Sequence, residues 1–285
     1  MKRILITLAF FATALSLAQQ EPQFTMFWNN YSMFNPANTG LHYKHYGNVV
    51  YRAQWDKVEN APNSFTGLYE AKLDSINSGV GIGYFRDVIG LGSSDRFYLN
   101  YAYHLQMESS VLSFGAGAVI NTRVFNPQWN PPQTPIDPSL PSGGHDTKLN
   151  LNFGVTYTRE KLEVGLSSTQ INQPFYEDIN FQSARHYFGM VCYNFKLSQN
   201  FDLKPSLFIK GVSSFYSLDL NALLIFKNQY WLGGTYRAQD AIGVMGGVEI
   251  KEKFRLGYSY DFITNTVLSQ YASGSHEIVL GILIK

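Results

Sequence analysis

The chain has 285 residues, of which 45% are hydrophobic and 15% are charged, and this composition excludes an intrinsically disordered protein. The formal net charge is +1, so the sequence lacks the basic excess of nucleic-acid-binding proteins and no nucleic-acid partner is expected. The single cysteine, Cys192, excludes an internal disulfide and any multi-cysteine metal or iron–sulfur centre.

Residues 1–18 are expected to form a signal peptide for export. Two basic residues precede an apolar stretch from Ile4 to Leu15, and a Ser-Leu-Ala cleavage pattern ends this region. The alternative is a membrane-anchoring helix, but the apolar stretch is shorter than the ~20 residues that a spanning helix needs. The mature chain is therefore expected to begin near Gln19.

Residues 19–46 are predicted to form an N-terminal segment ahead of the first strand. This segment is rich in Phe, Trp, Tyr and Asn. The sequence leaves two roles open, because the segment could plug the lumen of the barrel predicted below or dock a periplasmic component. Its candidate partner-binding residues are Phe24, Phe27 and Trp28, since aromatic side chains are enriched at binding hot spots.

The remaining chain, residues 47–285, alternates between apolar and polar side chains with a period of two. In residues 97–105 every odd-numbered position is Phe, Leu or Tyr, whereas the even-numbered positions include Asn100 and His104. Such alternation over about ten residues predicts strands with one apolar face. Fourteen strands are predicted, beginning near residues 47, 64, 78, 94, 110, 147, 161, 185, 201, 217, 228, 241, 253 and 274.

The connections between these strands alternate in length. Tight connections are predicted at residues 74–78, 106–110, 159–161, 197–200, 227–229 and 251–253. Longer ones are predicted at 56–63, 87–93, 123–146, 168–184 and 263–273, whereas 212–216 and 238–240 are short. An even number of strands, with short turns at one end and longer loops at the other, is typical of an outer-membrane β-barrel.

A soluble β-sandwich would also show alternation, but two further features favour the barrel. The strands are near the ~9–11 residues that a tilted membrane strand needs, and aromatic residues lie at the strand ends. We therefore predict an all-β fold with a single antiparallel outer-membrane barrel domain over residues 47–285. It should have about 14 strands, short periplasmic turns and longer extracellular loops.

The sequence predicts no catalytic, cofactor-binding or metal site. His42 and His45 are three residues apart but lack a nearby third ligand. The glycines in residues 79–83 lack the Lys-Ser/Thr that completes a phosphate-binding loop. Ser275 and His276 would suit a barrel-embedded hydrolase, although no Asn or Asp partner can be assigned to them. This hydrolase is the least favoured alternative.

Several short motifs resemble, in their order along the chain, the PorP/SprF family of type IX secretion system membrane proteins. They are Gln23-Phe24-Thr25, Asn35-Pro36-Ala37-Asn38-Thr39-Gly40, Tyr51-Arg52-Ala53-Gln54-Trp55, Ala61-Pro62, Gly81-Ile82-Gly83 with Asp87 and Gly90, Tyr101-Ala102-Tyr103, Trp231-Leu232-Gly233-Gly234-Thr235-Tyr236-Arg237, Asp240-Ala241-Ile242, Gly257-Tyr258-Ser259-Tyr260-Asp261 and Gly274-Ser275-His276-Glu277. The resemblance implies a bacterial outer-membrane barrel of the secretion and gliding machinery, without catalytic activity or a cofactor. It also implies partners, namely outer-membrane lipid, a secreted cargo protein or surface adhesin that the barrel helps to deliver or anchor, and other secretion-system components on the periplasmic side.

Two groups of residues are candidates for functional roles. Arg52, Arg237, Asp261 and Glu277 point inward under the alternation rule, so they are predicted to form a charge network in the lumen or, alternatively, to contact a partner directly. The Pro-rich segment 126–141 is predicted to be an external loop, with candidate partner-binding residues Asn126, Trp129, Pro131 and Pro132. The main alternative function is an outer-membrane porin or a hydrophobic-substrate transporter, which would use the same barrel.

Overall fold

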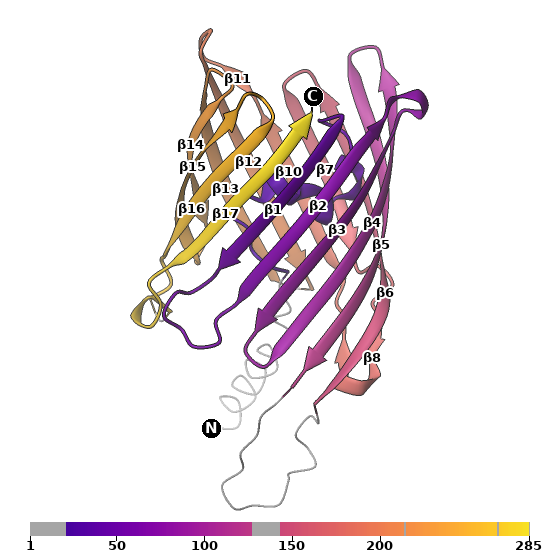
Figure 1. The fold of residues 1–285 in the computed structure, drawn as a ribbon, viewed down its shortest axis with the longest axis vertical. Helices are drawn as coiled ribbons and strands as arrows, with labels where there is room; N and C mark the ends of the chain where they lie inside the picture. The colour runs from indigo at the N-terminus through magenta and orange to yellow at the C-terminus, as the bar shows by residue number, and fades with distance from the viewer. Residues whose placement is uncertain (1–20, 127–142, 214, 267, 285) are drawn as a thin grey trace, which may run out of the picture.

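Fourteen wall strands form a closed antiparallel β-barrel (Figure 1). The computed structural model describes residues 21–126, 143–213, 215–266 and 268–284. The wall strands are β1 (His45–Ala53), β2 (Asn63–Leu73), β3 (Ser78–Ile89), β4 (Gly92–Met107), β5 (Ser110–Phe125), β6 (Gly144–Arg159), β7 (Leu162–Thr169), β10 (His186–Tyr193), β12 (Phe201–Val212), β13 (Phe215–Phe226), β14 (Tyr230–Arg237), β15 (Ala241–Ile250), β16 (Phe254–Ile263) and β17 (Ser275–Ile284). The prediction of an all-β barrel is confirmed.

Neighbours in sequence are neighbours in the wall, and the barrel closes where β1 pairs with β17. The short strand β11 (Phe195–Lys196) follows β10 and pairs with β12. A separate hairpin of β8 (Phe175–Tyr176) and β9 (Phe181–Gln182) encloses the 3-10 helix η5 (Glu177–Ile179). The other single-turn helices in the connections are η4 (Asp74–Ile76) and η6 (Leu268–Gln270). None of the described helices has the length and apolar character of a membrane-spanning helix.

The predicted strand starts differ from those in the structure by at most three residues. One predicted long connection, residues 87–93, is wrong, because β3 and β4 stay paired up to a two-residue turn at Gly90 and Leu91. Gly90 adopts the left-handed conformation (φ +57°) that such a tight hairpin requires. Asp87, the first residue of that predicted connection, faces the lumen and accepts a 2.6 Å hydrogen bond from the Ser64 hydroxyl.

The two ends of the barrel differ in their connections. At the end where β1 begins and β17 stops, the connections are short, and we call this the tight-turn end; the opposite end is the long-loop end. Strands β4, β5 and β6 have 16 residues each, more than the ~9–11 expected of a membrane strand. They extend past β1 and β2 at the long-loop end (Figure 1). In outer-membrane barrels the short turns are periplasmic, which places the tight-turn end in the periplasm.

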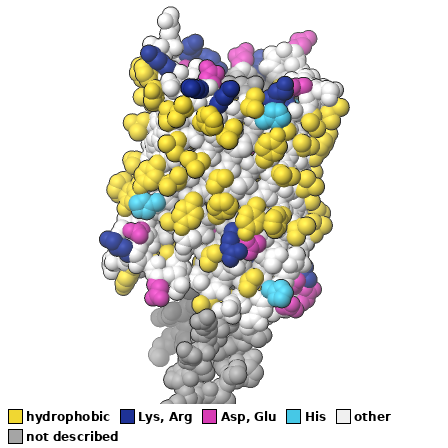
Figure 2. All heavy atoms as spheres, viewed as in Figure 1, with side chains coloured by type: hydrophobic (Ala, Val, Ile, Leu, Met, Phe, Trp, Pro, Cys, Tyr) yellow, Lys and Arg dark blue, Asp and Glu magenta, His cyan; other side chains and the backbone are white. Residues whose placement is uncertain are grey.

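The outer surface carries an apolar band between charged rims (Figure 2). Along β4, for example, Phe97, Leu99 and Tyr101 are exposed on the outside, whereas Asn100 and His104 are buried inside. This is the distribution of a barrel that faces lipid on the outside and polar groups on the inside.

The N-terminal segment lies inside the lumen. Residues 21–40 include the short helices η2 (Phe27–Asn30), α2 (Tyr31–Phe34) and η3 (Pro36–Asn38), which lie within the ring of strands (Figure 1). The Phe27 ring stacks on Phe208 of β12 at 4.4 Å, and the Phe34 ring packs on Phe188 of β10 at 5.3 Å. The sequence left open whether this segment plugs the lumen or docks a periplasmic component. In the structure the segment occupies the lumen.

The segment runs through the lumen from one end of the barrel to the other. The amide of Gly40 bonds Glu70 of β2 at 2.9 Å, close to the tight-turn end. Glu21 pairs with Arg96 of β4, towards the long-loop end. The chain thus crosses the whole lumen before it turns back to begin β1.

Small wall residues make room for this segment, and Gly115 of β5 is the clearest case. A Cβ added at Gly115 would lie 2.1 Å from the backbone nitrogen of Ala37. We therefore expect Gly115→Ala to loosen the segment at a cost of about 1–3 kcal/mol, the usual penalty of overpacking. Faster hydrogen exchange of residues 27–38 would report this loosening. Gly67→Ala is the matched control, because a Cβ at Gly67 meets nothing within 4 Å, and equal exchange in both variants would contradict the packing argument.

Candidate functional site

Three charged wall residues meet the N-terminal segment in the lumen. Arg52 of β1 donates to Asp261 of β16 at 2.7 Å and to Glu277 of β17 at 3.1 Å. The backbone amides of Thr25 and Met26 both donate to the Glu277 carboxylate, at 2.8 and 2.9 Å. The register of the β1–β17 pair brings Arg52 and Glu277 together, because the two residues are direct cross-strand partners. The cluster therefore holds the segment and the closing strand pair together.

A second set of charges extends this cluster along the wall. Arg237 of β14 donates to Asp219 at 3.2 Å and to Asp240 at 3.1 Å, and it lies 3.7 Å from Asp261. Lys210 of β12 donates to the other oxygen of Asp219 at 2.8 Å. The structure thus brings Arg52, Arg237, Asp261 and Glu277 together in one buried network. Sequence reasoning missed Lys210 and Asp219, although both are charged residues at inward positions of alternating strands.

Pairing is what makes these buried charges tolerable. Arg52, Asp261 and Glu277 are at most 2% exposed, and an unpaired charge in such surroundings would be strongly destabilising. The Thr25 hydroxyl donates to Asp261 at 2.7 Å and accepts from Arg52 at 3.0 Å. Because the segment itself supplies donors to the carboxylates, its departure would leave part of the network unsatisfied. This geometry indicates an anchored segment and a structural role for the network.

The aromatic residues proposed as partner contacts in the N-terminal segment are mostly buried. Phe24 and Phe27 are at most 3% exposed inside the barrel, so a partner would reach them only if the segment left the lumen. Trp28 is partly buried and lines a cavity at the tight-turn end.

Glu21 anchors the described start of the segment. Its carboxylate pairs with Arg96 and accepts a 2.6 Å hydrogen bond from Gln170. Burial by itself raises the pKa of Glu21, but the positive charge of Arg96, with smaller contributions from His186 and Arg123, lowers this pKa to about 2.

The lowered pKa of Glu21 predicts a pH-dependent contribution to stability. The ionised form is favoured in the folded state, so its stabilisation is complete above the ordinary pKa of 4.5 and is lost as the pH falls towards 2. We expect the difference in free energy of unfolding between wild type and Glu21→Gln to shrink between pH 4.5 and 2, as measured by urea titration at each pH. A difference that is constant over this range would contradict the assignment.

The long-loop rim carries the second group of candidate residues. Asn126 directly follows β5, and its amide donates to the Leu91 carbonyl at 3.0 Å. Trp129, Pro131 and Pro132, and nearly all of the predicted loop 126–141, lie outside the described residues. Beside Asn126, a rim cavity of about 320 Å³ is lined by Asp87, Ile89, Ser94, Arg123, Phe125 and Phe181, among others.

The hydrolase alternative fails on the geometry of β17. Ser275 is buried inside the barrel, where its hydroxyl accepts a hydrogen bond from the Trp55 amide at 3.2 Å. The neighbouring His276 points outward and contacts the Tyr258 hydroxyl at 2.7 Å. Successive side chains of a strand lie on opposite faces, so Ser275 and His276 cannot act as a nucleophile–base pair.

The two histidines of the weak metal hypothesis also separate. His42 lies 3.3 Å from Glu163, whereas His45 bonds the Tyr69 hydroxyl at 2.9 Å. Within the described ranges, no group of three or more His, Cys, Asp or Glu residues could hold a metal ion.

Comparison with solved structures finds the same fold in outer-membrane proteins of low sequence identity. The Ralstonia pickettii toluene transporter TbuX has a TM-score of 0.56 and 11% identity, covering 89% of this chain and 92% of that chain. The CymD monoaromatic hydrocarbon channel has a TM-score of 0.54 and 11% identity, covering 89% of this chain and 91% of that chain. The Acinetobacter baumannii outer membrane protein Omp33 has a TM-score of 0.51 and 8% identity, covering 87% of this chain and 100% of that chain. A search of curated proteins found no significant match.

The solved structures show the fold of the chain, and comparison with family models shows its family. Residues 16–282 match the model described as type IX secretion system membrane protein PorP/SprF. The match includes the N-terminal segment, the charge network and every wall strand apart from the last two residues of β17. A barrel of this kind resides in the bacterial outer membrane. The chain therefore belongs to the PorP/SprF family of type IX secretion system membrane proteins.

Proposed function

We propose that this outer-membrane component of the type IX secretion system is a closed, non-catalytic barrel that binds a secreted protein and helps to deliver or anchor it at the cell surface. The observation that carries the proposal is the N-terminal segment, which fills the middle of the lumen and is tied to the wall through Glu277 and Asp261. A lumen filled in this way favours a docking role over free diffusion of solutes.

Binding surface is available mainly at the long-loop rim. The barrel wall faces lipid, and the tight turns offer little area to a partner. The longest connections, such as residues 170–185 and 264–274, lie at the long-loop end, and binding residues of rigid scaffolds concentrate in loops of this kind. The predicted external loop 126–141, with Trp129, is our first choice for the contact.

Deleting residues 126–141 is expected to release the secreted partner from the cell surface while the barrel remains inserted. Wall hydrogen bonds run between strands, so a loop deletion leaves them intact. Trp129→Ala is expected to act in the same direction. Surface-retained and medium-released proteins are quantified by mass spectrometry after checking that the barrel is present in the outer membrane. An unchanged distribution with the barrel present would remove this loop from the anchoring role.

The alternative of a porin or hydrophobic-substrate transporter predicts other results. It expects a measurable conductance or substrate flux through the intact protein in planar bilayers or vesicles, and no change in retained proteins after the loop deletion. Affinity purification of the barrel from its native outer membrane, followed by mass spectrometry, identifies the partner that the docking proposal requires.

A further inference from the structure

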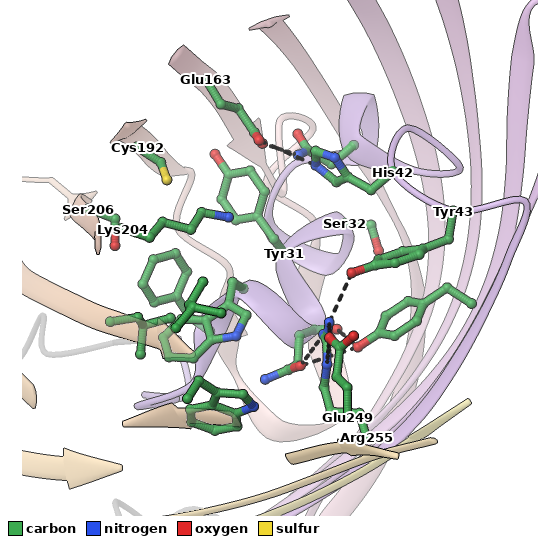
Figure 3. A pocket seen from close by; sticks show the side chains of 18 of the residues that line it. Tyr31, Ser32, His42, Tyr43, Glu163, Cys192, Lys204, Ser206, Glu249 and Arg255 are labelled. Atoms are coloured by element: carbon green, nitrogen blue, oxygen red, sulfur yellow. Dashed lines mark hydrogen bonds and ion pairs between the residues drawn. The ribbon is translucent and has the colours of Figure 1, made fainter. Parts of the chain in front are cut away.

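A cavity at the tight-turn end of the lumen has the size of a ligand site. Its volume is about 550 Å³, within the ~300–1,000 Å³ typical of ligand pockets. The N-terminal segment contributes Tyr31 and Ser32 to its lining (Figure 3). The turn residues Asn228 and Gln229 also line it. Because the tight-turn end faces the periplasm, a ligand would enter this cavity from that side.

One wall of the cavity is aromatic and aliphatic. Trp28 of the N-terminal segment and Trp231 of β14 meet edge to face at 6.1 Å between ring centroids. Phe27, Leu223 and Ile225 also line the cavity and pack in the same hydrophobic cluster as the two tryptophans. This wall would accept an apolar group of a ligand, since burial of its carbon surface is favourable.

Five of the six described charged residues that line the cavity have a charged partner or a backbone hydrogen bond. His42 lies 3.3 Å from Glu163, and Arg255 forms an ion pair with Glu249. Glu70 accepts a 2.9 Å hydrogen bond from a backbone amide of the N-terminal segment.

The exception is Lys204 of β12. Its side chain extends from the wall into the cavity, as Figure 3 shows. Its ammonium group lies beside the Cys192 thiol and within electrostatic reach of Glu163. Among the described residues, however, no carboxylate lies within 4 Å of this ammonium group. An ammonium group in a partly desolvated cavity favours an anionic ligand group, because charge-assisted hydrogen bonds are stronger there than in water.

We propose that this cavity binds an organic carboxylate that is joined to an aromatic or branched apolar group. The carboxylate pairs with Lys204, and the apolar group packs against Trp28 and Trp231. Two sources carry this chemistry, namely the C-terminal residue of a protein that reaches the barrel from the periplasm, or a free aromatic acid. The first source rests on the proposed docking function, whereas the second is independent of it.

The test uses three probes on the full mature chain, folded in detergent. They are N-acetyl-Leu-Phe with a free carboxylate, the same dipeptide as its C-terminal amide, and 3-phenylpropionate. Binding is followed by calorimetry and by the change in tryptophan fluorescence. We expect the acid to bind about tenfold more tightly than the amide, as one charge-assisted hydrogen bond implies. Lys204→Gln should abolish this preference, whereas Lys227→Gln, in the nearby turn after β13, should retain it.

Each outcome decides the proposal. A preference for the acid peptide that depends on Lys204 supports the site and a chain terminus as its source. Binding of 3-phenylpropionate alone, with the same dependence, supports the site and overturns the chain-terminus source. Equal binding of acid and amide, binding unaffected by Lys204→Gln in a variant with wild-type heat modifiability, or no binding of any probe overturns the proposal. None of these measurements involves the loop 126–141. A failure of the carboxylate-site proposal is therefore distinguishable from a failure of the proposed docking function.

Discussion

Replacing Glu277 by Gln is expected to lower the free energy of unfolding by about 3–5 kcal/mol, the usual effect of breaking a buried ion pair. The substitution keeps the shape of the side chain but removes the negative charge beside Arg52. It also gives up one of the two oxygens that accept hydrogen bonds from the Thr25 and Met26 amides. Urea titration of the folded barrel, read as the fraction with altered electrophoretic mobility when unheated, measures the loss.

A double-mutant cycle separates the interaction energy of Arg52 and Glu277 from other effects of the two substitutions on stability. Arg52→Met alone leaves Asp261 and Glu277 without their shared cation, so it should be similarly destabilising. The double variant Arg52→Met/Glu277→Gln should lose less than the sum of the two single variants, because they remove partners of one interaction. Glu108→Gln, in the exposed turn between β4 and β5, is the matched control and should change stability by about 0.5 kcal/mol at most. Strict additivity within the cycle would contradict the network described above.

Placing an arginine on the lipid-facing wall should be nearly as damaging. Tyr258, in the middle of β16, is 47% exposed on the outer surface. Tyr258→Arg is expected to cost about 2–4 kcal/mol, because its charge would be buried in the hydrocarbon region. The yield of folded barrel in lipid vesicles, measured against wild type, reports the effect.

The same substitution outside the bilayer provides the control. Tyr271 lies in the connection after β16 and is 70% exposed, so Tyr271→Arg should leave the folded yield close to that of wild type. An arginine at the adjacent Ser259 would not serve, because that side chain is completely buried inside the barrel. Equal yields for Tyr258→Arg and Tyr271→Arg would show that the outer face of β16 does not contact lipid.

The sequence by itself determined the strands and the direction of their side chains. Alternation with a period of two is a local property of each segment, since a strand with lipid outside and polar groups inside must repeat every second residue. The inward positions of Arg52, Arg237, Asp261 and Glu277 follow from the same rule. The length of the turn after β3 was not determined in this way, because residues 87–89 and 92–93 belong to two strands that stay paired up to Gly90 and Leu91.

Only the tertiary structure decided what fills the lumen and which charges pair there. The contact between Thr25 and Glu277 joins residues 252 positions apart, and it exists because closure of the barrel places β1 beside β17. The aromatic residues of the N-terminal segment are equally compatible with a surface patch or a packed plug. Their burial is settled by the space that residues such as Gly115 leave in the wall and by the donors that the segment supplies to buried carboxylates. Such complementarity depends on side chains from many strands at once, so it cannot be predicted from a local sequence pattern.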